Sequence, residues 1–233
     1  MISAAVMSSV ALAGPFEDLI RQVDGDFIPS GSSLNSGALP APPPSVKIER
    51  ISLKENWDDA ISWDNTPTSQ HAYPNPSSNP WAELLIGDSS TWYKMPNIRT
   101  YFRFRLNLPA GAHILGAKLV FHCSAGGPTK PKLDIHYIDT PNPSFRKEPW
   151  NLPLSRLSVP WEKEEHDWTW ITHEVYKTPD LKALIEEFAK KFGRNGVIGL
   201  EIIDRPGNVD NFKGLTSFDD EPALSTQLEI QYQ

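Results

Sequence analysis

Short runs of alternating hydrophobic and polar residues dominate the chain from residue 46 onward. Between residues 99 and 106, Phe102, Phe104 and Leu106 share one side, while Tyr101, Arg103 and Arg105 share the other. Because side chains alternate between the two faces of a β-strand, this pattern predicts a half-buried strand, with the arginines free to pair with carboxylates on a neighbouring strand. Similar patterns predict strands at 46–53, 81–87, 114–123, 132–139, 168–175, 197–203 and 227–232.

One segment has helical periodicity instead. Thr178 is a suitable N-cap, Pro179 suits the first helical position, and Gly193 suits the end of the helix. A stripe with the 3.6-residue spacing of one buried helix face is formed by Leu181, Leu184, Ile185, Phe188 and Phe192. The sequence therefore predicts one short helix among the strands.

Proline and turn residues separate these elements. The segments 65–80 and 140–160 are rich in proline and are interpreted as loops. About eight short strands and one helix predict an all-β fold, an antiparallel β-sandwich of the jelly-roll type.

Residues 1–45 differ from the rest and are interpreted as an extended, apolar and proline-rich N-terminal arm and linker, with the β-sandwich domain at 46–233. The segment 2–13 is apolar and ends in a sequence resembling a signal-peptidase site, but no Lys or Arg precedes it. We interpret it as a retained arm, with a cleaved signal peptide as the alternative. The apolar residues expected to dock on a partner subunit are Val6, Val10, Phe16, Leu19 and Ile20.

Composition limits the classes of function. The 233-residue chain has a formal net charge of −7, which disfavours binding to nucleic acid or to an anionic membrane. No run reaches the length of about 18 apolar residues that a transmembrane helix needs. Its one cysteine, Cys123, excludes a disulfide framework or a cysteine-based zinc site within the chain and is interpreted as a buried core residue.

The order of several motifs resembles the DNRLRE-type β-sandwich domains, a family related to carbohydrate-binding modules. The motifs are RTYFRFRL at 99–106, LPAGAHI at 108–114 and GAKL at 116–119, followed by the segment 168–175, the helix after Pro179 and the loop 217–222. The resemblance covers residues 46–233. It implies a jelly-roll fold in a secreted or cell-surface protein, and binding modules of this type often carry a structural calcium ion.

No motif typical of catalysis is present, since the sequence contains no H-E-x-x-H, no G-x-S-x-G, no phosphate-binding loop and no dinucleotide fingerprint. We therefore expect a non-catalytic protein. Paired carboxylates at Asp58-Asp59 or near Glu162 could serve a glycosidase, but such runs are more often solvated surface.

Most of the eight tryptophans fall in or next to predicted loops. Sugar rings stack on aromatic side chains while their hydroxyl groups bond to polar neighbours, so mixed aromatic and polar runs predict glycan contacts. The candidate residues are Trp57, Asp58, Trp63, Asp64, Trp92 and Tyr93. The alternative is that these rings close the ends of the sandwich or form a protein interface. Trp168 and Trp170 are assigned to the core or to an interface.

The acidic run Asp219, Asp220 and Glu221 could supply oxygen ligands to Ca²⁺, the one cofactor that the sequence suggests. An acidic turn without an ion is the alternative, because the spacing of an EF-hand is absent.

The sequence favours a non-catalytic structural and binding module of a large extracellular-type assembly, such as a virion decoration, a fibre or a surface layer. Its arm would dock on neighbouring protein subunits. The alternative function is a secreted polysaccharide-binding module. Both place the protein outside a cell or on the surface of a virion or cell.

Overall fold

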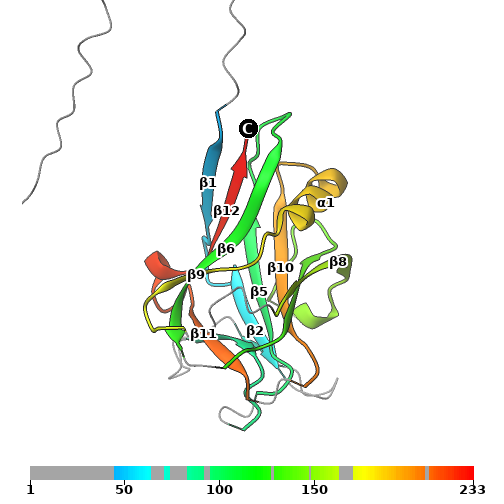
Figure 1. Ribbon diagram of the computed structural model, residues 1–233. Helices are drawn as coiled ribbons and strands as arrows, with labels where there is room; N and C mark the ends of the chain where they lie inside the picture. Colours follow the sequence, from blue (N-terminus) through cyan, green and yellow to red (C-terminus); the bar gives the residue numbers. More distant parts are fainter. Residues whose placement is uncertain are drawn as a thin grey trace, which may run out of the picture. The chain divides into compact units, whose positions relative to one another are not determined.

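The computed structural model describes residues 45–63, 71–73, 83–91, 95–126, 129–146, 148–162, 170–207 and 210–233. Residues 1–44 of the predicted arm lie outside these residues. The described strands form two antiparallel sheets that pack face to face around a shared hydrophobic core (Figure 1). This architecture confirms the predicted all-β sandwich.

The first sheet has the order β1-β12-β6-β11-β4, with β9 also paired to β6. Its strands are β1 (Lys47–Ser52), β4 (Glu83–Gly87), β6 (Ile114–Ala125), β9 (Val175–Lys177), β11 (Phe212–Thr216) and β12 (Gln227–Tyr232). The second sheet has the order β3-β2-β5-β10-β7-β8. Its strands are β2 (Asp59–Trp63), β3 (His71–Tyr73), β5 (Arg99–Arg105), β7 (Leu133–Ile138), β8 (Leu154–Trp161) and β10 (Val197–Asp204).

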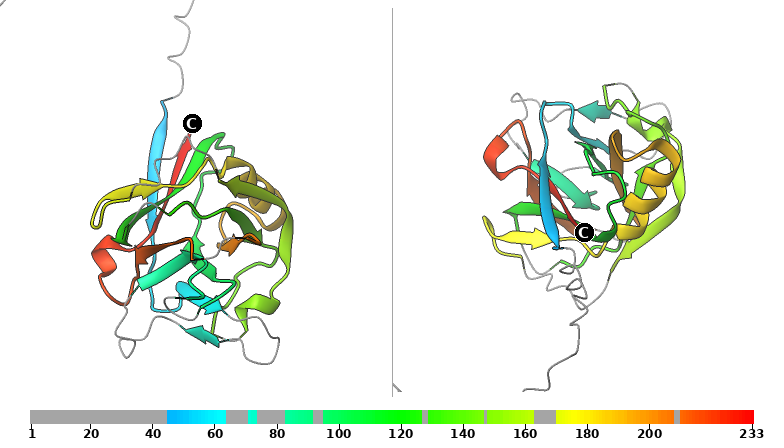
Figure 2. Two further views of the ribbon diagram at one scale, coloured as in Figure 1. Left: turned by 60° about the horizontal axis from the view of Figure 1, so that its bottom comes forward. Right: turned by 90° about the horizontal axis from the view of Figure 1, so that it is seen from above.

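Eight of these strands have the connectivity of a jelly roll. One layer contains β1-β12-β6-β9 and the facing layer contains β5-β10-β7-β8. Numbered one to eight along the chain, the layers read 1-8-3-6 and 2-7-4-5, which is the double Greek-key arrangement of this fold. The remaining strands, β2, β3, β4 and β11, extend the sheets (Figure 2).

The core contains the residues that the alternation places inward. Phe102, Phe104 and Leu106 are buried in the main cluster, as predicted, and Cys123 is a buried core residue. Tyr101 on the opposite face of β5 is also fully buried, because it packs with Phe145 in a second, smaller cluster on the outer side of the sheet. The chain that follows β7 packs over this face of β5 and buries Tyr101. The alternation of residues in β5 predicted the same face to be exposed to solvent.

The helix α1 (Lys182–Phe192) begins later than predicted. Leu181 is its N-cap residue, whereas Thr178 accepts a hydrogen bond from the Leu119 amide with its hydroxyl oxygen, and Asp180 accepts one from the Lys182 amide. The buried stripe contains Leu184, Ile185 and Phe188, as the spacing predicts, and it packs against β6 and β7. Gly193 ends the helix with φ of 95°, a conformation that favours glycine.

Two segments interpreted as loops contain regular structure. The short helix η1 (Pro149–Asn151) and all of strand β8 except Trp161 lie within 140–160, and the three-residue strand β3 lies within 65–80. β8 contains Pro160, but it is an edge strand of its sheet, where a residue without an amide proton is tolerated. A second short helix, η2 (Pro222–Leu224), precedes β12.

The prediction of a strand at 168–175 is wrong for residues 171–174, since β9 begins only at Val175. Residues 171–174 form a turn in which His173 has a positive φ of 71°. Trp170 is nevertheless a core residue, as expected, and it packs with Phe121, Trp161 and Tyr176. Trp161 is one of the tryptophans next to a predicted loop, 140–160, but it is fully buried at the end of β8.

Candidate functional site

The turn between β1 and β2 carries two of the predicted glycan-binding residues. Asp58 accepts hydrogen bonds through Oδ2 from the amides of Lys54, at 2.8 Å, and Glu55, at 3.2 Å. These bonds fix the turn, so the Asp58 side chain is nearly buried. Trp57, one residue earlier, is only partly buried.

Arg103 on β5 links this turn to the sheet. Its Nη1 lies 3.2 Å from Asp58 Oδ1 and 3.1 Å from Glu55 Oε1, and its Nη2 donates to Asn142 Oδ1 at 3.0 Å. The expectation that Arg103 pairs with carboxylates is thus confirmed, although the carboxylates belong to a turn and not to a neighbouring strand. Because the guanidinium contacts three groups, its plane is held in one orientation.

A cleft of about 270 Å³ opens beside this network, lined by Lys54, Glu55, Asp58, Arg103, Arg105 and Val197. Its walls combine guanidinium and ammonium donors with carboxylate acceptors. Such a surface offers both kinds of hydrogen-bonding partner that sugar hydroxyl groups need. The volume is just below the range of about 300–1,000 Å³ that is typical of pockets enclosing a whole small ligand. The cleft therefore suits one ring or one carboxylate of a longer polymer.

Of the predicted glycan-binding residues, Asp58 lines this cleft, whereas Trp57 and Trp63 are not among its lining residues. Trp63 is the last residue of β2 and packs, partly buried, against the hydrophobic core. Asp64, Trp92 and Tyr93 lie outside the described residues. The same is true of the predicted docking residues Val6, Val10, Phe16, Leu19 and Ile20.

The predicted calcium ligands lie on the turn after β11. Asp220 and Glu221 are exposed, whereas both carboxylate oxygens of Asp219 are buried without a hydrogen-bond partner. Within the described part of the chain, no group of three or more His, Cys, Asp or Glu side chains is placed to hold a metal ion. The three consecutive residues therefore do not converge as one ligand cluster.

Asp59, the first residue of β2, meets this turn. Its Oδ2 accepts a hydrogen bond from the Phe218 amide at 2.7 Å, although the two residues are 159 positions apart. The side chain is fully buried and faces the interior of the sandwich. Burial raises the pKa of Asp59 to about 7, and the negative charges of Asp219 and Asp58 add to the effect. From the sequence, Asp59 could be identified only as one member of the acidic pair Asp58-Asp59, and its burial could not be predicted.

A second buried carboxylate, Glu201, lies on the outer face of β10, opposite Tyr101 of β5. Glu201 accepts a hydrogen bond from Arg99 Nη1 at 3.2 Å. Burial raises the pKa of Glu201 to about 7, while Arg99 opposes the shift. Burial and the charge of Glu201 also raise the pKa of Tyr101, whose hydroxyl is hydrogen-bonded to Ser62 at 2.9 Å.

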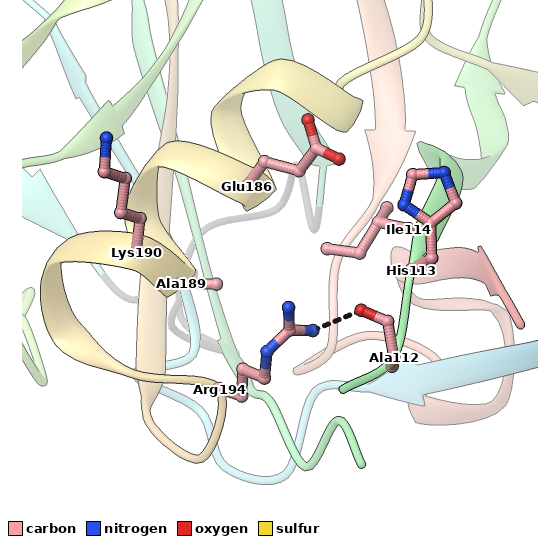
Figure 3. Close-up of a pocket in the computed structure, with 7 residues that line it drawn as sticks. All are labelled: Ala112, His113, Ile114, Glu186, Ala189, Lys190 and Arg194. Carbon is pink, nitrogen blue, oxygen red and sulfur yellow. Dashed lines mark hydrogen bonds between the residues drawn. The ribbon is translucent and has the colours of Figure 1, made fainter. Parts of the chain in front are cut away.

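A further cavity of about 280 Å³ lies between α1 and the start of β6, and none of the predicted site residues lines it (Figure 3). Arg194, just after the helix, donates a hydrogen bond to the Ala112 carbonyl at 2.6 Å. In Figure 3 Glu186 and His113 border the opening, while Lys190 points away from it. The mixed charges of this cavity select no single class of ligand.

Within the described residues, no helix is both long enough and apolar enough to cross a bilayer. No protein-family model matches the chain, and no relative is found among curated proteins.

Proposed function

We propose that this chain is a non-catalytic structural and binding module of a large extracellular-type assembly. The observation that supports this proposal is the state of β1, the strand into which the predicted arm leads. β1 is an edge strand, and among the described residues it pairs on one side only, with β12. An edge strand offers unpaired backbone groups to a strand from another chain.

Apolar exposure at the same strand supports this proposal. Val46 and Ile48 are 57% and 59% exposed, although most large apolar side chains of the described sandwich are buried. Edge strands that avoid association usually carry charges at such positions. An arm that docks on a neighbouring subunit would bring this strand to the contact and cover both side chains.

Deleting residues 1–45 tests the proposal. The full chain is expected to assemble, as measured by light scattering on a sizing column, and the truncated chain is expected to be a folded monomer. Ile48→Thr should weaken assembly, whereas Val175→Thr, at a similarly exposed position on β9, should leave it unchanged. A full chain that is monomeric at every concentration, alone and with subunits co-purified from its source, would refute the proposed role.

Polysaccharide binding is the second candidate function, and the cleft beside Asp58 and Arg103 favours it. The cleft is polar and is fixed by the ion pairs of Arg103, and the partly buried Trp57 precedes the lining residue Asp58 in the chain. A sugar stacked near this ring and bonded to the cleft would resemble carbohydrate recognition in general. Both functions can coexist in one displayed sandwich.

A panel of acidic and neutral polysaccharides tests this second function through tryptophan fluorescence. Arg103→Met should abolish a saturable change, because it removes the central donor of the cleft. Arg50→Met is the matched control, since Arg50 is paired with Glu229 on the first sheet and is not among the residues that line the cleft. If no polysaccharide produces a saturable change, or if both variants respond equally, polysaccharide binding at this cleft is excluded.

A further inference from the structure

Three carboxylate oxygens are buried without partners at one end of the sandwich. They are Asp59 Oδ1, Asp219 Oδ1 and Asp219 Oδ2. No group of the described residues donates a hydrogen bond to any of them. A buried charged oxygen without a donor is strongly destabilising, so these three oxygens require an explanation.

Asp59 begins β2 of the second sheet, Asp219 lies on the turn after β11 of the first sheet, and one hydrogen bond joins these two segments. The Phe218 amide donates to Asp59 Oδ2 at 2.7 Å, and Asp219 is the next residue in the chain. The charge of Asp219 acts on Asp59 strongly enough to contribute to its raised pKa. Asp58 also adjoins the pair, but its oxygens are already bonded to Arg103 and to the amides of the β1–β2 turn.

We infer that Asp59 and Asp219 bind a hard divalent cation of the calcium class between the two sheets. A shared proton could satisfy two of the three oxygens and would leave one unpaired. A divalent cation accepts all three as ligands and cancels both charges. The donors are oxygens alone, which favours Ca²⁺ or Mg²⁺ over zinc or copper, and Ca²⁺ completes a shell of six to eight ligands with carbonyl and water oxygens.

This site differs from the one that the sequence predicted. Asp219 is retained, but Asp59 replaces Asp220 and Glu221, which are exposed. The cation would connect β2 of the second sheet to the turn between β11 and β12 of the first. Because Asp219 lies on a surface turn, an ion can reach the pair without unfolding of the core. The site depends on neither the assembly role nor the cleft.

The experiment uses the full chain after treatment with EDTA, at pH 7.5, and measures Tm during titration with CaCl₂ and with MgCl₂. At about 100 times the Kd, binding to the folded state alone is expected to raise Tm by about 5 to 10 °C. Terbium luminescence, sensitised by nearby aromatic side chains, reports occupancy independently of stability.

Asp219→Asn and Asp59→Asn should each lower the apparent affinity for the cation by tenfold or more. Both the Tm titration and the terbium titration should report this loss. Asp220→Asn is the matched control and should bind as the parent chain does, because its side chain is exposed on the same turn. Asp219→Asn keeps the test valid if Asp59→Asn fails to fold. The inference is overturned if neither cation shifts Tm, if Asp220→Asn alone loses the shift, or if Tm responds to pH but to no cation, which would indicate a shared proton.

Discussion

Replacing Asp59 with Asn in the cation-free protein should stabilise the fold at alkaline pH. The pKa of Asp59 rises from 3.8 to about 7 in the folded state. Between these two values the folded chain binds more protons than the unfolded chain, so the free energy of unfolding falls as pH rises through this window. Each pKa unit corresponds to about 1.36 kcal/mol, so the full cost above pH 7 is about 4 kcal/mol.

Asn avoids this cost because it has no charge to bury, and its amide oxygen can still accept the hydrogen bond from Phe218. We therefore expect Asp59→Asn to be more stable than the parent by up to about 4 kcal/mol at pH 8, and nearly equal to it at pH 4. Glu201, whose pKa is also raised to about 7, contributes a slope of the same sign to both proteins and cancels in the difference.

Urea denaturation in EDTA, followed by circular dichroism at pH values from 4 to 8, measures the difference. Asp220→Asn serves as the control for removing one acidic charge from the same end of the sandwich, and it should show no such pH-dependent gain. The reasoning is refuted if the parent and Asp59→Asn have parallel stability profiles, or if Asp59→Asn is the less stable protein at pH 8.

Four further substitutions test the helix packing, the backbone conformation and the ion pairs of Glu229. Phe188→Ala on α1 should cost about 3–5 kcal/mol in urea denaturation, because the ring is fully buried, and a loss below about 1 kcal/mol would contradict the helix packing. Gly87→Ala should lower the free energy of unfolding by at least about 2 kcal/mol, since φ is 99° and the new Cβ would lie 2.0 Å from the Asn211 carbonyl oxygen. Gly111→Ala is the comparison, because open space surrounds that position, and it should cost about 1 kcal/mol. Glu229→Gln should lower Tm at pH 7, because Lys177 and Arg50 stabilise the charged form of Glu229 and lower its pKa. The difference in Tm from the parent should shrink as pH falls below 4.5, where the carboxylate becomes protonated. Equal differences at pH 7 and pH 3 would show that these ion pairs do not stabilise the fold.

Much of the fold was predictable because its strands are locally consistent. The alternation around Phe102 and in β12, and the helical stripe around Phe188, describe single elements whose one face meets the core. The missed elements lack such a signal. β8 contains Pro160, and β9 is three residues long after a turn at His173, so their pairing partners determine them more than their own sequence does.

The candidate sites were less predictable, because contacts over long sequence distances create them. Trp57 and Asp58 could be named from their mixed aromatic and acidic character, but the contact of Asp58 with Arg103 spans 45 positions. The contact of Asp59 with Phe218 spans 159 positions. Asp59 is buried because it belongs to strand β2, and no alternating pattern in the sequence predicts that strand. The acidic run at 219–221 draws attention to this turn, but nothing in the sequence connects the turn with Asp59.

The pairing of β1 with β12 also governs the order in which this protein can fold. Lys47 is in register with Tyr232, so the first strand of the sandwich can pair only after the last strand has been synthesised. During synthesis on a ribosome, β1 and β6 are therefore both exposed until β12 emerges, and folding should be slow because the decisive contacts are remote in sequence. A chain interrupted before residue 227 would leave two strand edges unpaired and would be prone to aggregation and to capture by chaperones.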